Sequence, residues 1–159
     1  MPTTEALPLS TLFERDETAW LEIMSGLAAE GLSGELDLPN LGEYLADMAK
    51  RDRREVDSRL VVLLAHLLKW EYQPDLRSGS WQGTIEEQRR ELRKLLESGT
   101  LFNHAVAEFA AVYADARKQA AAETLLPRGT FPVECPWEFE SLLMDEESEP
   151  ETDAPSNGN

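Results

Sequence analysis

The chain has 159 residues, of which 31 are acidic and 15 basic, so its formal net charge at pH 7 is −16. This length suits about one domain, and a hydrophobic content of 42% is enough for one core. The excess of acids argues against a protein that binds nucleic acid through phosphate contacts.

The single cysteine, Cys135, excludes an internal disulfide and fits a reducing compartment. The longest apolar run, 60–68, is too short to span a bilayer. The first residues have neither the basic nor the apolar region of a secretory signal. We therefore expect a cytoplasmic protein that does not enter the membrane.

Glycine and proline positions divide the chain into long unbroken stretches, which predict helices. The first helix is expected over 12–30, with Thr11 and Glu14 forming a capping box. The second is expected as one long helix over 40–73. Its middle, residues 50–59, carries five bases and three acids, whereas residues 60–72 are apolar almost all round. The front half should therefore be half-exposed and the back half central to a bundle.

A third helix should begin near Trp81, with Ser80 as its cap. A fourth is expected over 101–124, where large and then small apolar residues form a packing seam at helical spacing that includes Val106. Prolines exclude regular structure over 125–136, and Pro136 can open a last short helix over 137–144.

The predicted architecture is all-α, a single-domain bundle of four main helices with a short C-terminal helix. Residues 1–10 are expected to be flexible, and residues 11–144 to form the helical domain. Residues 145–159 contain six acids and no base, which predicts a disordered acidic tail.

Several motifs occur in a distinctive order. His66-Leu67-Leu68-Lys69-Trp70 lies within 64–74, Ser80-Trp81 follows, and Phe131-Pro132 and Cys135-Pro136-Trp137 come near the end. Over roughly 13–144 this order resembles the bacterial family called "domain of unknown function 29". The resemblance implies an all-α fold, and it implies no activity and no catalytic residue.

His66 is the first candidate for a functional side chain. A short turn between the second and third helices would make them antiparallel, which places His66 opposite Gln88 and next to Arg89. One interpretation is a partly buried histidine hydrogen-bonded to Gln88 or to a backbone carbonyl. The alternative is a general acid or base, with Lys69 and Arg89 as further catalytic candidates.

The turn after the second helix is the second candidate. Lys69, Arg77, Ser78 and Ser80 gather there, and a helix N-terminus favours anions. A phosphate-bearing ligand could bind with Trp70, Arg77 and Ser80 as contacts. The alternative, which we favour, is ordinary surface charge with a helix cap, because a phosphate loop would carry more glycine.

No metal or cofactor is expected. His66 and His104 are the only histidines, and no metal-ligand spacing is present. His104 should lie solvated on the outer face of its helix. Glu134 beside Cys135 works against a nucleophilic thiolate.

The sequence thus favours a non-enzymatic protein-interaction or regulatory module whose partner is another protein, perhaps a basic one, while the oligomeric state is left open. The alternative is a small-molecule, phosphate-binding or enzymatic site around His66, Lys69, Trp70 and Arg89. The two differ in a structural observation, namely whether these side chains converge in an open pocket.

Overall fold

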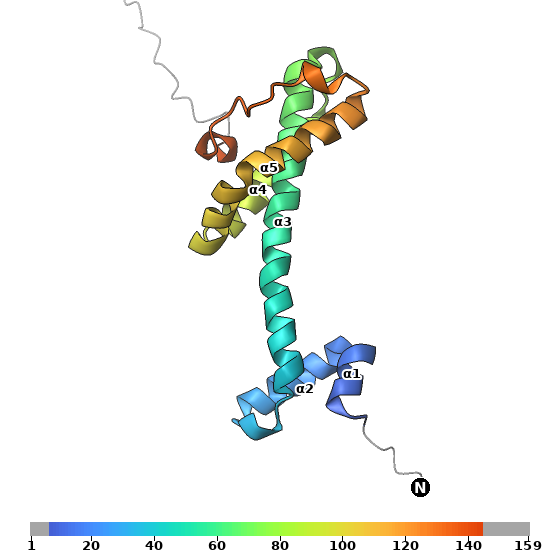
Figure 1. Cartoon of the computed structure of the whole chain (residues 1–159), viewed down its shortest axis with the longest axis vertical. Coiled ribbons are helices and arrows are strands. Elements are labelled where there is room, and N and C mark those ends of the chain that lie inside the picture. The colour runs from blue at the N-terminus through green and yellow to red at the C-terminus, as the bar shows by residue number, and fades with distance from the viewer. Residues whose placement is uncertain (1–6, 145–159) are drawn as a thin grey trace, which may run out of the picture. The chain divides into compact units, whose positions relative to one another are not determined.

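A computed structural model describes residues 7–144 of the chain, and this part is all-α, as predicted. No strand occurs within residues 7–144. Four short 3-10 turns accompany the α-helices, which are α1 (Leu9–Arg15), α2 (Glu17–Ala29), α3 (Leu38–Tyr72), α4 (Gly79–Leu95) and α5 (Gly99–Thr124) (Figure 1). In the described part of the chain, no helix has the length and apolar character needed to cross a membrane.

The helical region predicted for residues 11–144 comprises two compact units, one up to Arg51 and one from Asp52 onward. The boundary falls within α3, so the first unit contains α1, α2 and the beginning of that helix. The second unit contains the rest of α3 with α4, α5 and the segment that follows them. The predicted acidic tail, 145–159, lies outside the described residues.

The first predicted helix, over 12–30, is wrong as a single element, because the chain breaks at Asp16. This residue has φ −149° and ψ 79°, and its carboxylate accepts a hydrogen bond of 3.0 Å from the amide of Ala19. It therefore caps α2, as aspartate commonly does. The predicted cap at Thr11 is not used, because α1 already begins at Leu9.

Trp20 forms the centre of the first unit and is completely buried. Its ring packs edge-on against Phe13, with centroids 4.7 Å apart, and lies 5.9 Å from the ring of Tyr44. The indole N–H donates to Asp37, 3.1 Å away, whose carboxylate also accepts from the Asn40 side chain at 2.8 Å. Asp37 directly precedes α3, so one carboxylate links the start of the long helix to the core of this unit.

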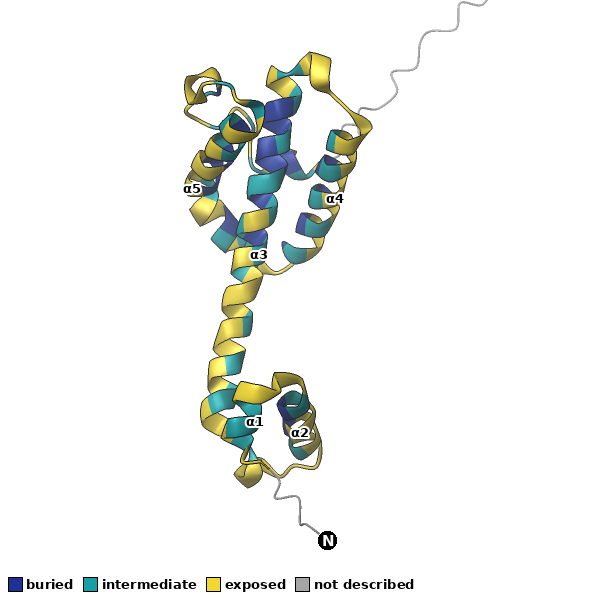
Figure 2. Ribbon diagram, turned by 90° about the vertical axis from the view of Figure 1, so that its right-hand side faces the viewer, coloured by how far each residue is buried: buried dark blue, intermediate teal, exposed yellow. Residues whose placement is uncertain are grey.

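The second half of α3 is the core of the second unit, as its all-round apolar sequence predicts. Val56, Leu60, Leu64 and Leu68 are completely buried. Figure 2 shows this part of α3 running between α4 and α5, with its buried surface facing both. The packing seam predicted for α5 is wrong at one residue, Val106, which is 50% exposed.

Serines cap both later helices, but the predicted cap of α4 is wrong by two residues. The Ser78 hydroxyl accepts from the amide of Trp81 at 3.3 Å, and Ser78 has the extended backbone of a capping residue. Ser80 lies inside the first turn, where its carbonyl accepts from Thr84. Ser98 caps α5 in the same way through the amide of Leu101.

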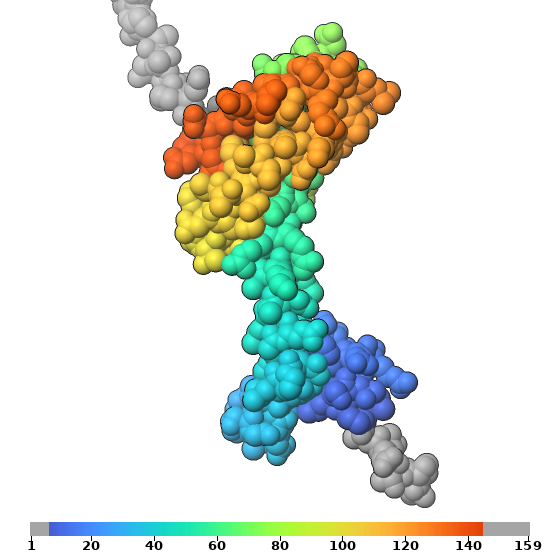
Figure 3. All heavy atoms as spheres, viewed as in Figure 1, coloured from blue at the N-terminus to red at the C-terminus, as the bar shows by residue number. Residues whose placement is uncertain are grey.

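Residues 125–144, here called the strap, return across the second unit after α5 ends. Figure 3 shows the strap in orange and red against the gold surface of α5. The Tyr113 hydroxyl donates to the Pro132 carbonyl at 2.7 Å, and Arg117 donates to the Phe131 carbonyl at 3.0 Å. These bonds seat the side chain of Phe131, which is only 1% exposed, in the core.

The predicted short helix over 137–144 is wrong, because the segment forms only a 3-10 turn at Glu140–Leu143. Its backbone is held from α4 instead. Arg89 donates to the Leu142 carbonyl at 2.9 Å, and Arg93 donates to the Leu143 carbonyl at 3.0 Å. Carbonyls satisfied by arginine side chains do not need the bonds of a regular helix.

Candidate functional site

Lys69, a predicted catalytic candidate, is buried and engaged on both sides. Its ammonium nitrogen lies 2.7 Å from Glu123 Oε2 on α5 and 4.9 Å from the centre of the Trp81 ring on α4. Burial tends to raise the pKa of Glu123, but hydrogen bonds from Lys69 and Gln119 outweigh this and hold the pKa below its ordinary value. The Glu123 carboxylate is therefore charged near neutral pH, and the contacts of Lys69 join α3 to α5 and α4.

Arg77 and Trp70 contact each other at the turn after α3. The guanidinium carbon of Arg77 lies 5.0 Å from the centre of the Trp70 ring, and its Nε donates to the Trp70 carbonyl at 2.8 Å. This bond satisfies one of the carbonyls left open at the end of a helix. Ser80, the third predicted ligand contact, is exposed within the first turn of α4.

Arg89 is buried, and its Nε donates to the Leu142 carbonyl of the strap. Its Nη1 lies 3.5 Å from Glu86 Oε1. Beside it is a small hollow of about 40 Å³, lined by Leu67, Trp70, Gln82, Ile85, Glu86 and Arg89. A volume of this size holds about three water molecules. The hollow brings two predicted candidates together, Trp70 and Arg89.

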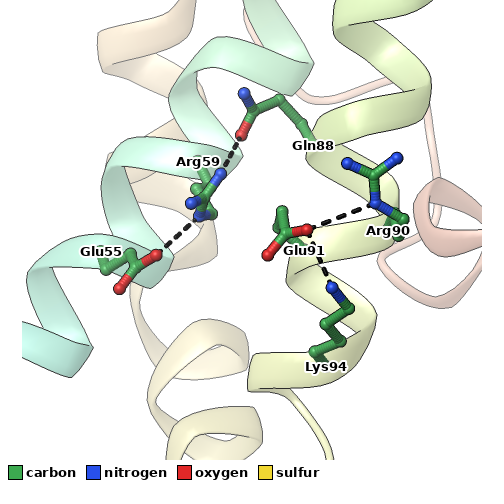
Figure 4. Close-up of polar contacts among 6 residues, drawn as sticks. All are labelled: Glu55, Arg59, Gln88, Arg90, Glu91 and Lys94. Atoms are coloured by element: carbon green, nitrogen blue, oxygen red, sulfur yellow. Dashed lines mark hydrogen bonds and ion pairs between the residues drawn. The ribbon is translucent and has the colours of Figure 1, made fainter.

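His66 is bonded within its own helix, with Nδ1 2.8 Å from the Val62 carbonyl, so the neutral ring donates from Nδ1. Burial lowers its pKa below the ordinary value of 6.5. Of the two partners predicted for His66, the backbone carbonyl is confirmed and Gln88 is wrong. Gln88 instead accepts from Arg59 at 3.2 Å, and Arg59 is also paired with Glu55 at 2.9 Å (Figure 4). The predicted neighbours Trp70 and Ile85 do line one hollow between α3 and α4, so the register differs from the predicted one in which side chain Gln88 contacts.

One turn after Gln88, α4 carries a charged cluster in which Glu91 is partly exposed and both of its basic partners are exposed (Figure 4). Glu91 accepts from Lys94 at 3.0 Å and from Arg90 at 3.3 Å. Both bases are about two-thirds exposed, so these pairs contribute little stability. Arg90 and Lys94 therefore belong to the solvated surface of the helix.

The two other titratable residues considered in the sequence, His104 and Cys135, contact the protein's own residues. His104, predicted to be solvated, is partly buried and lies 2.9 Å from Asp57, where it links α5 to α3. Burial raises the pKa of the Cys135 thiol, which keeps it protonated. Within residues 7–144, no group of three or more His, Cys, Asp or Glu side chains could hold a metal ion.

The larger hollow of the second unit lies elsewhere, between α5 and the strap. This strap groove has a volume of about 480 Å³ and is lined by Phe102, Val106, Glu138, Phe139 and Glu140. Clefts that bind ligands typically measure about 300–1,000 Å³. The groove is therefore large enough to take a bulky side chain of a partner.

Phe139 builds the apolar wall of the groove. Its ring meets Phe102 and Phe109 edge-on, with centroids 5.6 and 5.3 Å apart. These contacts fix the strap to α5 and leave Val106 at the opening. Sequence reasoning missed this site, because it placed Val106 in a closed seam. A signal was present in Glu138-Phe139-Glu140, an aromatic residue between two acids.

Residues 12–147 match the family model described as "Domain of unknown function DUF29". The chain belongs to this family. The resemblance inferred from the sequence over 13–144 is thereby confirmed. No curated protein and no solved structure matches the chain. Since the DUF29 description carries no activity, the function has to be argued from the geometry of this chain.

Proposed function

We propose that this DUF29 protein is a non-enzymatic protein-interaction module that receives a partner protein at the strap groove. The observation that carries the proposal is the contrast between the two hollows. The one beside the predicted catalytic candidates measures about 40 Å³, whereas the strap groove measures about 480 Å³. The strap groove therefore offers far more room to a group from another molecule.

The contacts of the catalytic candidates support the same conclusion. Lys69 is held by Glu123, Arg89 by the strap backbone, and His66 by its own helix. Each of these side chains has a different hydrogen-bond partner, and His66 also lies within electrostatic range of Lys69 and Glu123. A general acid or base needs an open position within hydrogen-bond reach of a substrate. The engagement of Lys69 by Glu123 and of Trp70 by Arg77 supports the interaction module over an enzymatic or phosphate-binding site around these residues.

The chemistry of the strap groove suits a protein ligand. Apolar atoms come from Phe102, Val106 and Phe139, and the only charged residues that line it are Glu138 and Glu140. An exposed apolar surface with a polar edge is typical of protein-binding sites.

Site-specific photocrosslinking in cells of the source organism tests the proposal. A photoreactive residue replaces Val106 in the groove, and the matched control replaces Ala122, which is also exposed on α5 but does not line the groove. We expect a discrete protein adduct from position 106 that is absent from position 122. Identical adducts from both positions, or none from position 106, would overturn the proposal.

A further inference from the structure

We infer that the partner segment is a basic amphipathic helix, which inserts an apolar side chain into the strap groove and places Lys or Arg side chains against Glu138 and Glu140. The inference rests on the proposed function and adds the chemistry of the partner to it. Three observations carry it: the floor of the groove, the charge of its rim, and the absence of a strand in the described part of the chain.

The floor of the groove is formed by one face of a helix. Phe102 and Val106 are four residues apart on α5, so their side chains are neighbours one turn apart. Such a row forms a ridge against which another helix packs its own side chains. Residues 7–144 contain no sheet edge that an extended peptide could join. Helix-in-groove binding, with apolar anchors three and four residues apart, is therefore the recognition mode that fits.

The rim of the groove specifies the charge of the partner. Glu138 and Glu140 are both exposed, and within residues 7–144 neither carboxylate takes part in an ion pair. The nearby cations of α4, Arg89 and Arg93, donate to carbonyls of the strap. Arg89 and Arg93 keep their positive charge but do not line the groove, so the charged groups of the lining itself, Glu138 and Glu140, are negative.

The surrounding sequence carries the same sign of charge. Residues 119–144 contain four acids and one base, and residues 145–159 contain six acids and no base. A basic segment would be attracted toward this part of the chain, and an acidic one would be repelled. Charge complementarity therefore favours Lys and Arg on the partner helix.

Binding of designed helical peptides to the full chain tests the inference. The probe is a labelled 18-residue helix with a leucine stripe at positions i, i+3, i+4 and i+7 and with lysines on both sides of the stripe. Matched peptides carry glutamine or glutamate in place of lysine, or alanine in place of leucine. Fluorescence anisotropy at low and moderate salt gives each Kd. We expect the lysine peptide to bind most tightly and to weaken as salt is added.

Two double variants distinguish the effect of the groove carboxylates on peptide affinity from the effect of the net charge of the chain. Glu138→Gln with Glu140→Gln should weaken the lysine peptide about three- to tenfold, as expected for two partly exposed ion pairs, and should leave the glutamine peptide unchanged. The matched control, Glu108→Gln with Glu134→Gln, removes the same charge from exposed residues of α5 and the strap outside the groove lining. The control should change Kd less than twofold. Circular dichroism checks that both variants keep their helices.

Several outcomes would overturn the inference. The first is an equal affinity of the chain for the lysine and glutamine peptides. The second is an equal loss of affinity for the lysine peptide in both double variants. The third is that no peptide binds. Self-association of the chain that Val106→Asp abolishes would also overturn it, because the occupant would then be a second copy. In each case a discrete adduct from the photoreactive residue at position 106 would leave the proposed function standing, so the two failures are distinguishable.

Discussion

Removing Glu123 should destabilise the protein more than removing Lys69, although the two form one ion pair. The Lys69 side chain is 9% exposed, whereas that of Glu123 is 37% exposed. Replacement of Glu123 by alanine leaves a buried ammonium without its counter-ion. Replacement of Lys69 by methionine removes the buried charge, keeps most of the apolar stem, and leaves a carboxylate that water can solvate.

The expected magnitudes follow from this asymmetry. An uncompensated buried charge costs about 3–5 kcal/mol. The Trp81 ring, 4.9 Å from the ammonium, offsets about 0.5–2 kcal/mol of this. Glu123→Ala should therefore lower the free energy of unfolding by about 1–4.5 kcal/mol, with a central value of about 3 kcal/mol. Lys69→Met should lower it by about 1 kcal/mol or less, because a buried ion pair is often replaced by apolar groups at little cost.

Urea unfolding followed by far-ultraviolet circular dichroism measures both values. The double variant should be close to Lys69→Met alone, because the carboxylate matters mainly as the counter-ion of the buried lysine. Asp115→Ala, which removes an exposed pair of 3.7 Å with Lys118, is the control and should change stability by less than about 0.5 kcal/mol. A loss for Lys69→Met that equals or exceeds the loss for Glu123→Ala would refute the reasoning.

Four further predictions concern other parts of the chain. Because burial lowers the pKa of His66, the contribution of this histidine to stability should be complete above pH 6.5 and decline below it. The difference in the free energy of unfolding between wild type and His66→Gln should therefore become smaller in acid. A difference that does not change with pH would contradict this. Trp20→Ala should cost the first unit about 3–5 kcal/mol and raise hydrogen exchange there, while the second unit keeps its protection. Tyr113→Phe leaves the Pro132 carbonyl without its donor and should cost about 1–2 kcal/mol. Since burial raises the pKa of Tyr113 from 10.0 to about 12, wild type should also lose stability between those pH values in urea titrations, and the variant should lose less. Deletion of 145–159 should leave the melting temperature almost unchanged, and a large drop would show that this segment packs on the rest.

Local chemistry alone determined much of the fold. The long α3 was predictable because no glycine or proline interrupts 43–73, and its observed bounds differ from the predicted ones by one or two residues. α5 was predictable within two residues at its start and matched at its end, Thr124. The motifs around Lys69-Trp70 also led to the DUF29 family. All these signals come from residues close together in the sequence.

Only the tertiary structure decided which side chains meet. The register of α4 against α3 depends on how two apolar surfaces pack, and it paired Gln88 with Arg59 where spacing alone had suggested His66. The helix predicted over 137–144 does not form, and arginines of α4 satisfy the carbonyls of Leu142 and Leu143 there, a compensation that local propensity does not reveal. The same packing of Phe139 against α5 left Val106 open at the strap groove. Contacts between residues far apart in the chain therefore created the candidate site, whereas the sequence determined the helices that carry it.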